Sequence, residues 1–437
     1  MMMKMRLDEA FEFKGYWWRP DDPDKMVAGV LSYKPGESII LELIGTFDKE
    51  NNAVVAFLNK AEEGIIHGVL GNAKKVTLVK CYPSGSVNMS SFFPIIRYTC
   101  IYCFIGRHYG GMDDEGRFKI AVHYPELPHW CHPGVLRETF LEDKEKKGQI
   151  ISLSFEAIVG GKTLNAVELD DGFKLQIKGG ASFTGDYAML NNGIGQTSWL
   201  EISHKEMVSF NKLLSRVYQF EEFLSLATMR VVEASEMSFY DEDYYQEYDS
   251  GDKHYHSIDF FSSHWRGKDS EKVDNARFLF GYEAIKDRYG EIMRAWYADV
   301  NDMYPVRNNL VDSLEKKRLF SNMDFLILAR ALDGYCIRSK YKGSITNRMK
   351  TVIDKFSDVS RIKRDGINVD ELVDSRDYYA HFMPRSRKEH ILDGFELHAL
   401  TKKVRRLLIC CVLSDLGLDN AAIDMIFKNS NSRFITE

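Results

Sequence analysis

The sequence predicts an α+β protein in which a β-rich, sandwich- or barrel-like N-terminal domain precedes an all-α helical bundle. Short runs rich in β-branched residues, separated by turns, fill the chain to about residue 200. Beyond them, apolar residues recur every three or four positions, which is typical of amphipathic helices. With 437 residues, 44% of them apolar, the chain can bury more than one core. We expect a regulatory or sensor domain at 1–203, a connecting helix, acidic loop and short strands at 204–290, and the bundle at 291–437.

The first half contains six runs with the composition of strands. They are residues 38–44, 54–58, 75–79, 117–122, 149–155 and 173–177. Between two such runs lie Asp170, Asp171 and Gly172, which predict a hairpin turn, and we expect the same of residues 114–116. A sequence of short strands joined in this way favours a sandwich or a barrel.

The period of the apolar residues changes near residue 204. From His204 to Thr228 they recur at helical spacing, so we expect a helix that leads into the second half. Residues 233–252 follow, with eight acids and several tyrosines, and predict an exposed, mobile loop. The functional alternative for this stretch is an acidic surface that mimics the phosphates of a nucleic acid.

The chain is predicted to be helical from Glu291 onward. Ser321 and Asp324 resemble a capping box at the start of a helix that runs through Tyr335. Residues 345–359 and 390–416 form two further candidates, and Gly417 is a good stop for the second. Several helices with short connections predict a bundle.

A short helix is predicted near the carboxyl end, between Asn368 and Pro384. Asn368 can cap its start, Leu372 belongs to its apolar stripe, and Pro384 prevents much continuation beyond Phe382. This helix would carry an arginine, an acid and a histidine within six residues.

This arginine, acid and histidine are Arg376, Asp377 and His381. Asp377 and His381 are one turn apart on the same face, so the carboxylate can orient the imidazole and favour its cation. Arg376 and His381 are five residues apart and diverge by about 140°. We therefore expect a second copy, packed about a two-fold axis, to bring both arginines and both histidines into one cleft.

The segment from Arg376 to His381 resembles the R-polar-x-x-x-H signature of HEPN (higher eukaryotes and prokaryotes nucleotide-binding) ribonucleases, in which this motif is a metal-free active site, usually composite across a dimer. Other segments are similar in order and spacing to ApeA-type anti-phage proteins. They are residues 278–297 and 324–335 toward the carboxyl end, and 11–17, 29–31, 40–46 and 76–81 toward the amino end. Asp333 departs from the glutamate expected there, which puts a role for this acid in the site in doubt.

The resemblance implies a metal-independent endoribonuclease of an anti-phage, abortive-infection system, with tRNA as target and a phage-derived trigger. His381 would be general base or acid in attack by a ribose 2′-hydroxyl, Arg376 would stabilise charge on the phosphoryl oxygens, and Asp377 would orient His381. Arg385, Arg387 and Lys388 could bind flanking phosphates, although a solvated basic turn explains them equally well. No cofactor and no metal are expected.

Charge and cysteine content fit this reading. The net charge is −6, yet residues 305–437 hold 24 Lys and Arg against 18 Asp and Glu, or +6, the sign expected for an RNA-binding region. Seven scattered cysteines favour a reducing compartment. Because we see neither a long apolar run nor a signal peptide, we expect a cytoplasmic protein that is not membrane-bound and forms at least a homodimer.

Other motifs offer weaker alternatives. Cys100, Cys103, His129, Cys131 and His132 are candidate zinc ligands, but the first two lie in a strand-like run without a turn glycine. Residues 160–163 resemble a phosphate-binding loop but lack its upstream glycine. Residues 193–198 resemble a dinucleotide-binding fingerprint, but they precede a strand-like run where that fingerprint requires a helix. The rival function is a non-catalytic RNA- or protein-binding sensor whose helical half only oligomerises.

Overall fold

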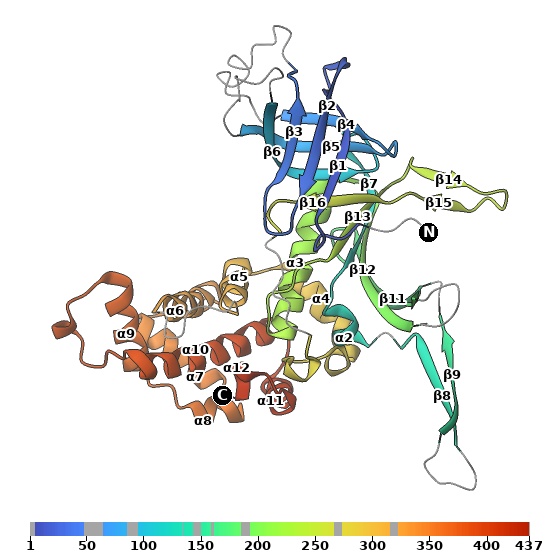
Figure 1. The fold of residues 1–437 in the computed structure, drawn as a ribbon. Helices are drawn as coiled ribbons and strands as arrows, with labels where there is room; N and C mark the ends of the chain where they lie inside the picture. Colours follow the sequence, from blue (N-terminus) through green and yellow to red (C-terminus); the bar gives the residue numbers. More distant parts are fainter. Residues whose placement is uncertain are drawn as a thin grey trace.

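The structure, a computed structural model, describes residues 5–47, 64–84, 95–132, 134–142, 150–158, 161–184, 193–265, 273–314 and 322–436. It confirms the α+β class: a β-rich region that includes a closed barrel precedes a helical region (Figure 1). The predicted strand at 54–58 lies outside the described residues. The predicted boundary at 203 falls within one continuous strand, and the domain limits remain a prediction.

Six antiparallel strands form the barrel. They are β1 (Phe11–Arg19), β2 (Asp22–Tyr33), β3 (Ile39–Ile44), β4 (Gly64–Leu70), β5 (Lys75–Ser84) and β6 (Ile95–Ile105). Pairing runs β6-β3-β2-β1-β4-β5 and closes through β5 and β6. Alternate residues point inward, so Leu31, Leu41 and Leu78 are fully buried in the barrel core. Gly68 is required because a Cβ there would lie 2.3 Å from the indole of Trp17.

The barrel is continuous with an open sheet because β6 changes neighbours along its length. Its first half, from Ile95 to Cys100, pairs with β3, and its second half pairs with β16 (Ile258–Ser262). The sheet then continues through β13 (Glu236–Asp241), β7 (Glu115–His123), β12 (Gly193–Ser209), β11 (Phe173–Thr184) and β10 (Lys162–Glu168). Two hairpins stand apart from it: β8 (Leu136–Glu142) with β9 (Ile150–Ala157), and β14 (Tyr245–Glu247) with β15 (Lys253–Tyr255).

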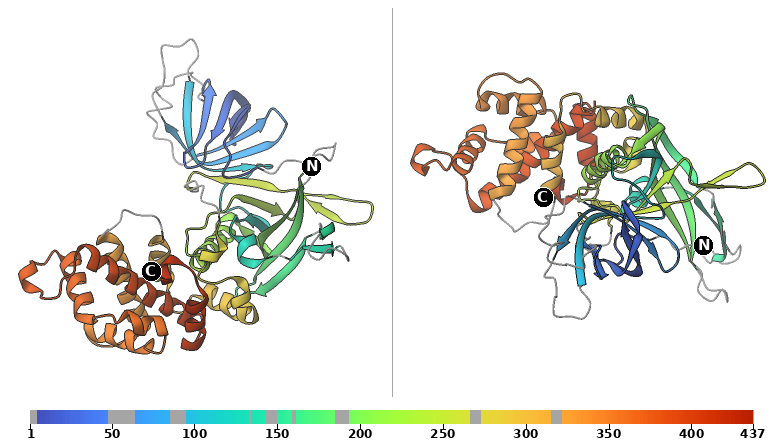
Figure 2. Two further views of the ribbon diagram at one scale, coloured as in Figure 1. Left: turned by 60° about the horizontal axis from the view of Figure 1, so that its bottom comes forward. Right: turned by 90° about the horizontal axis from the view of Figure 1, so that it is seen from above.

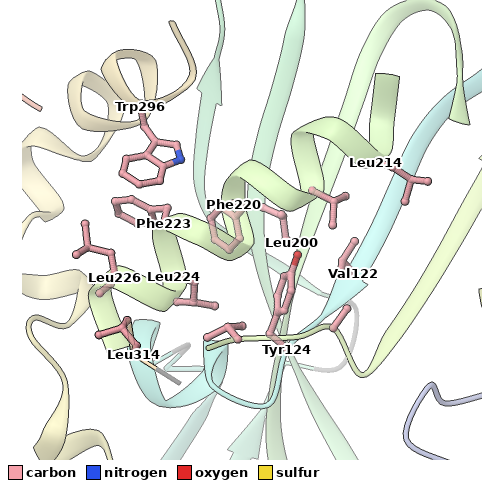
Figure 3. Packing of buried hydrophobic residues seen from close by; sticks show 14 of the residues in the cluster. Val122, Tyr124, Leu200, Leu214, Phe220, Phe223, Leu224, Leu226, Trp296 and Leu314 are labelled. Atoms are coloured by element: carbon pink, nitrogen blue, oxygen red, sulfur yellow. The ribbon is translucent and has the colours of Figure 1, made fainter. Parts of the chain in front are cut away.

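Helix α3 (Phe210–Thr228) joins the sheet to the helical region. Its Phe220 packs toward Val122 and Leu200 of the sheet, while Phe223 meets Trp296 of α4 (Tyr289–Ala298) edge to face (Figure 3). The indole of Trp296 also donates a 2.7 Å hydrogen bond to the carbonyl of Gln219. In Figure 2, α3 lies between the open sheet and the helical region in both views. One face of this helix is therefore buried against the sheet and another against α4.

The helical region is built around α10 (Gly394–Asp415), which contacts α6 (Asn322–Arg338) along much of its length. Leu407, Leu408 and Cys411 of α10 are fully buried, as expected for a central helix. The remaining helices are α2 (Leu127–Cys131) beside the sheet, and α5 (Tyr304–Asp312), α7 (Ile345–Lys355), α8 (Ser360–Asp365), α9 (Val369–His381), α11 (Asn420–Asn429) and α12 (Arg433–Thr436). None of the described helices combines the length and apolar character that a bilayer span needs.

Most of the predicted elements are confirmed. Strands β3, β5, β7, β9 and β11 cover five of the six predicted runs, and Asp170–Gly172 turns between β10 and β11 as expected. The helix predicted from His204 begins only at Phe210, because β12 continues to Ser209, whose hydroxyl caps the helix by accepting from the amide of Lys212. Gly417, with a φ of +86°, follows the end of α10. Ser321 of the predicted capping box lies outside the described residues.

Two predictions near the open sheet are wrong. Residues 114–116 do not connect a hairpin, since β6 and β7 are separated in the sheet by β13 and β16. Residues 233–252 are not one exposed loop, because Glu236–Asp241 forms strand β13 between β7 and β16. Within β13, Met237, Ser238, Phe239 and Asp241 are all buried. The number of acids in this stretch concealed the strand.

Candidate active site

The candidate site lies on α9, at the end of the helical region that is far from the barrel (Figure 1). Asn368 caps the helix, since its Oδ1 accepts from the amides of Asp370 at 3.0 Å and Glu371 at 3.4 Å. Leu372 is buried and anchors the helix to the bundle. Phe382 ends it in a left-handed conformation, with a φ of +51°. The predicted helix is confirmed at both ends.

Arg376 and His381 meet within a single chain. Nη1 of Arg376 lies 3.2 Å from Nε2 of His381 and 2.8 Å from Oδ1 of Asp377. The long arginine side chain thus spans the angular divergence expected between positions five apart. Because a guanidinium can only donate, a hydrogen bond at this contact has Nε2 of His381 as its acceptor.

Asp377 is held by two cations. Its Oδ1 accepts from Arg376, and its Oδ2 accepts from Nζ of Lys388 at 2.9 Å. Partial burial raises the pKa of Asp377, but hydrogen bonds from Arg376 and Lys388 outweigh it, so the pKa lies below its ordinary value. The carboxylate is therefore ionised at neutral pH, with its oxygens directed at the two cations.

The segment 382–393, which we call the strap, returns along α9 and is fastened to it. Lys388 also bonds Oδ1 of Asp374 at 3.1 Å, and the amide of His390 donates to Oδ2 of the same aspartate at 3.2 Å. The amide of Leu392 donates to Oγ of Ser375 at 2.9 Å, and its carbonyl accepts from the hydroxyl of Tyr379 at 3.1 Å. These contacts fix the strap beside the Arg–His pair.

The site is open on one side. His381 is exposed, and Phe382 directly after it exposes 90% of its surface. Arg376 is more enclosed, with 21% of its side chain exposed, and its buried Nε makes no hydrogen bond to any described residue. A phosphate that approaches from solvent would therefore meet the imidazole and the outer guanidinium nitrogens.

Comparison with known families identifies the chain. The sequence model described as ApeA N-terminal domain 1 matches residues 12–296, which is more than half of the chain. The chain belongs to the ApeA family. A second model, described as Apea-like HEPN, matches residues 264–422 and so includes the whole of α9 and the strap. No curated protein and no solved structure matches significantly.

Family membership confirms the suspected resemblance and makes this a defence-related HEPN protein. HEPN domains generally act on RNA and dimerise. The catalytic roles of Arg376, Asp377 and His381 in this ApeA-family chain remain predictions.

The predicted phosphate-binding residues occupy three different environments. Arg385 pairs with Asp393 on the surface, with both terminal nitrogens 2.9 Å from Oδ2. Arg387 is exposed and has no ion-pair partner among the described residues. Lys388 is engaged by Asp374 and Asp377, as described above. Of the three, Arg387 is the most accessible to an incoming phosphate.

Asp333, the departure noted in the sequence, lies on α6 and is mostly buried. Its Oδ1 accepts from Nε and Nη2 of Arg348, at 3.0 and 2.6 Å, which ties α6 to α7. Since both helices contact α9, this ion pair supports the scaffold under the site. The sequence contained no local signal for this pairing.

The candidate zinc ligands are dispersed. Cys100 pairs with Cys81 across β5 and β6, and the thiol of Cys131 donates to the hydroxyl of Ser198 at 3.5 Å. Within the described ranges, no three His, Cys, Asp or Glu side chains are grouped in a way that could hold a metal ion. Thr163 and Gly193 belong to strands β10 and β12, and Gly160 lies outside the described residues.

Proposed function

We propose that this ApeA-family protein is a metal-independent endoribonuclease that cleaves RNA by attack of a ribose 2′-hydroxyl. The observation that carries the proposal is the 3.2 Å contact between Nη1 of Arg376 and Nε2 of His381 at the exposed end of α9. It places a permanent cation and a titratable base within reach of one phosphodiester.

The two side chains divide the chemistry. A bound phosphate competes for the N–H groups of Arg376, and this frees the Nε2 lone pair of His381. Nε2 then takes the 2′-hydroxyl proton as the P–O2′ bond forms and the P–O5′ bond breaks. The products are a 2′,3′-cyclic phosphate and a 5′-hydroxyl, whose oxygen receives a proton from the imidazolium or from water. Arg376 stabilises the negative charge on the phosphoryl oxygens.

The exposed aromatic residues beside the site support a homodimer. Phe382 exposes 90% of its surface at the end of α9, and Phe395 exposes 79% at the start of α10. Aromatic side chains are enriched at protein interfaces. We propose that a second copy covers them, which would bring a second Arg–His pair toward the same cleft.

The family supports a biological setting for this activity. We propose tRNA as the substrate, cleaved in an abortive-infection response to a phage-derived trigger, with Arg387 and Arg385 contacting flanking phosphates. The positive charge of the region after residue 305 fits an RNA partner.

Purified protein with a labelled tRNA pool tests the proposal. We expect His381→Ala to lower the cleavage rate at least 100-fold while circular dichroism and melting temperature stay unchanged. His390→Ala is the matched control, since this residue is exposed on the strap and its hydrogen bond to α9 comes from the backbone amide. Equal rates for His381→Ala and wild type would reject the nuclease assignment.

The rival function is a non-catalytic sensor, and one cavity could serve as its binding site. A hollow of about 640 Å³ at the junction of barrel and open sheet is lined by Lys74, Arg107, Tyr244 and His256, among others. If the protein is only a sensor, phage protection in cells would survive His381→Ala. Loss of protection in this variant, with protein levels unchanged, favours the nuclease.

A further inference from the structure

Lys388 is already engaged by two carboxylates, so its ammonium is not free to bind an RNA phosphate. Its ammonium lies between Asp374 and Asp377, 3.1 and 2.9 Å from their nearest oxygens, and only 21% of its side chain is exposed. The two aspartates are three residues apart on one face of α9, so their like charges would repel without a cation between them. Lys388 neutralises this pair and joins the strap to the catalytic helix.

The division of Asp377 between two cations determines what Arg376 can do. With Lys388 on Oδ2, Asp377 offers Arg376 only Oδ1, and Nη1 of Arg376 also reaches His381. Without Lys388, both oxygens would be available for a two-pronged arginine–carboxylate pair, the strongest arrangement of these groups. Arg376 would then be drawn toward Asp377 and away from the imidazole and the phosphate.

We propose that Lys388 is a positioning residue, which holds Asp377 so that Arg376 remains directed at His381. The inference rests on the proposed ribonuclease function and assigns to Lys388 a role other than phosphate binding. It predicts an effect on the rate of the bound complex, whereas a phosphate contact would affect affinity and its salt dependence.

Single-turnover cleavage at saturating RNA, together with RNA binding in a His381→Ala background, separates these roles. We expect Lys388→Met to lower the cleavage rate at least tenfold and to change the dissociation constant less than threefold. The slope of log affinity against log salt should also stay constant, since each lost phosphate contact reduces it by about 0.7 for single strands. Arg387→Ala provides the comparison, with weaker binding and a smaller slope.

Three further variants isolate the cause. Lys388→Arg keeps a donor for both aspartates and should retain at least a third of the wild-type rate. Asp374→Asn combined with Lys388→Met restores the local charge but leaves Oδ2 of Asp377 free, so its rate should stay low. Lys428→Met removes the same type of group from an exposed ion pair with Asp424 on α11 and should leave the rate unchanged.

The outcomes distinguish this inference from the function on which it depends. If His381→Ala abolishes cleavage but Lys388→Met cleaves at the wild-type rate, positioning by Lys388 is wrong and the nuclease stands. If Lys388→Met weakens binding tenfold with a smaller salt slope and an unchanged rate, Lys388 is a phosphate contact. If the double variant recovers the wild-type rate, local charge is the cause and positioning is rejected. If His381→Ala still cleaves, the proposed function and this inference both fail.

Discussion

Nη1 of Arg376 lies 3.2 Å from Nε2 of His381, although the two residues are five positions apart on one helix. The same nitrogen also bonds Asp377. These two contacts use one nitrogen, so the second terminal nitrogen of the rigid guanidinium remains for a phosphate oxygen, whereas a lysine presents a single nitrogen.

Replacement of this arginine by lysine should therefore be damaging although it keeps the charge. We expect Arg376→Lys to reduce single-turnover cleavage at least 30-fold and RNA affinity less than threefold. Arg385→Lys, at an exposed ion pair, is the comparison and should keep more than half of the activity. Retention of full activity by Arg376→Lys would show that charge alone suffices.

The chemistry of the substrate offers a second prediction. An RNA with a single 2′-deoxy substitution at the cut site should be cleaved at least 1000-fold more slowly there, because the nucleophile is missing. EDTA should leave the rate of the normal substrate unchanged. Mass spectrometry of the products should find a 2′,3′-cyclic phosphate, and a 5′-phosphate product would contradict this route.

Stability of the helical region depends on a buried ion pair between α8 and α10. Arg406 of α10 donates to both oxygens of Asp365, at 2.6 and 2.9 Å, and both side chains are at most 5% exposed. Arg406→Met removes both short contacts and leaves this carboxylate only Nε of Arg361, 3.4 Å from Oδ1, so it should cost about 3 kcal/mol, the lower end of the range for a broken buried pair. Urea unfolding should show that Arg406→Met with Asp365→Asn costs less than Arg406→Met alone.

Glu221 on α3 should make stability depend on pH. Burial, with repulsion from Glu233, raises the pKa of Glu221 to about 8, although the amide of Ala234 partly offsets this. The unfolded value is near 4.3, so the folded state binds the proton more tightly and stability falls as pH rises from about 4 to about 8. Each unit of pKa difference contributes about 1.4 kcal/mol.

Glu221→Gln cannot ionise, so its loss of stability between pH 5 and pH 8.5 should be smaller than that of the wild type. Urea unfolding at both pH values measures the difference. Glu283→Gln, at a side chain that is 69% exposed, should leave the wild-type pH dependence intact. Parallel curves for Glu221→Gln and wild type would mean that Glu221 ionises normally in the folded protein.

Dimer formation through the exposed aromatic residues can be tested directly. Phe382→Ser should shift the protein toward monomer in sedimentation velocity and raise the dissociation constant at least tenfold. Met425→Ser changes a side chain that is 63% exposed on α11 and should not alter assembly. An unchanged dimer in Phe382→Ser would place the interface elsewhere.

Local signals in the sequence predicted α9 well, because Asn368 and Leu372 act within one or two helical turns of their own positions. The contact between Arg376 and His381 was not predictable from angles on a helical wheel, because a long side chain reaches across the divergence that Cα positions impose. Lys388 was assigned to phosphate for a similar reason. Its partners lie 11 and 14 residues away, on an element to which only the folded strap returns.

Sheet order escaped prediction because it depends on pairings distant in sequence. Strand β13 joins β7, more than 100 residues earlier, and its acids resembled those of a loop. By contrast, the hairpin at Asp170–Gly172 is local and was predicted correctly.

Because β6 pairs with both the barrel and the open sheet, truncation of the chain is a poor way to study its parts separately. A deletion of residues 1–203 would remove β6 and β7 and cut β12, so that β13 and β16 would pair only with each other and the apolar face of α3 would lose the sheet beneath it. The resulting fragment would aggregate through unpaired strand edges, so its toxicity in cells would say little about repression by the missing part. Point changes on the outer surface of the barrel are the sounder way to ask whether the N-terminal region controls the proposed nuclease.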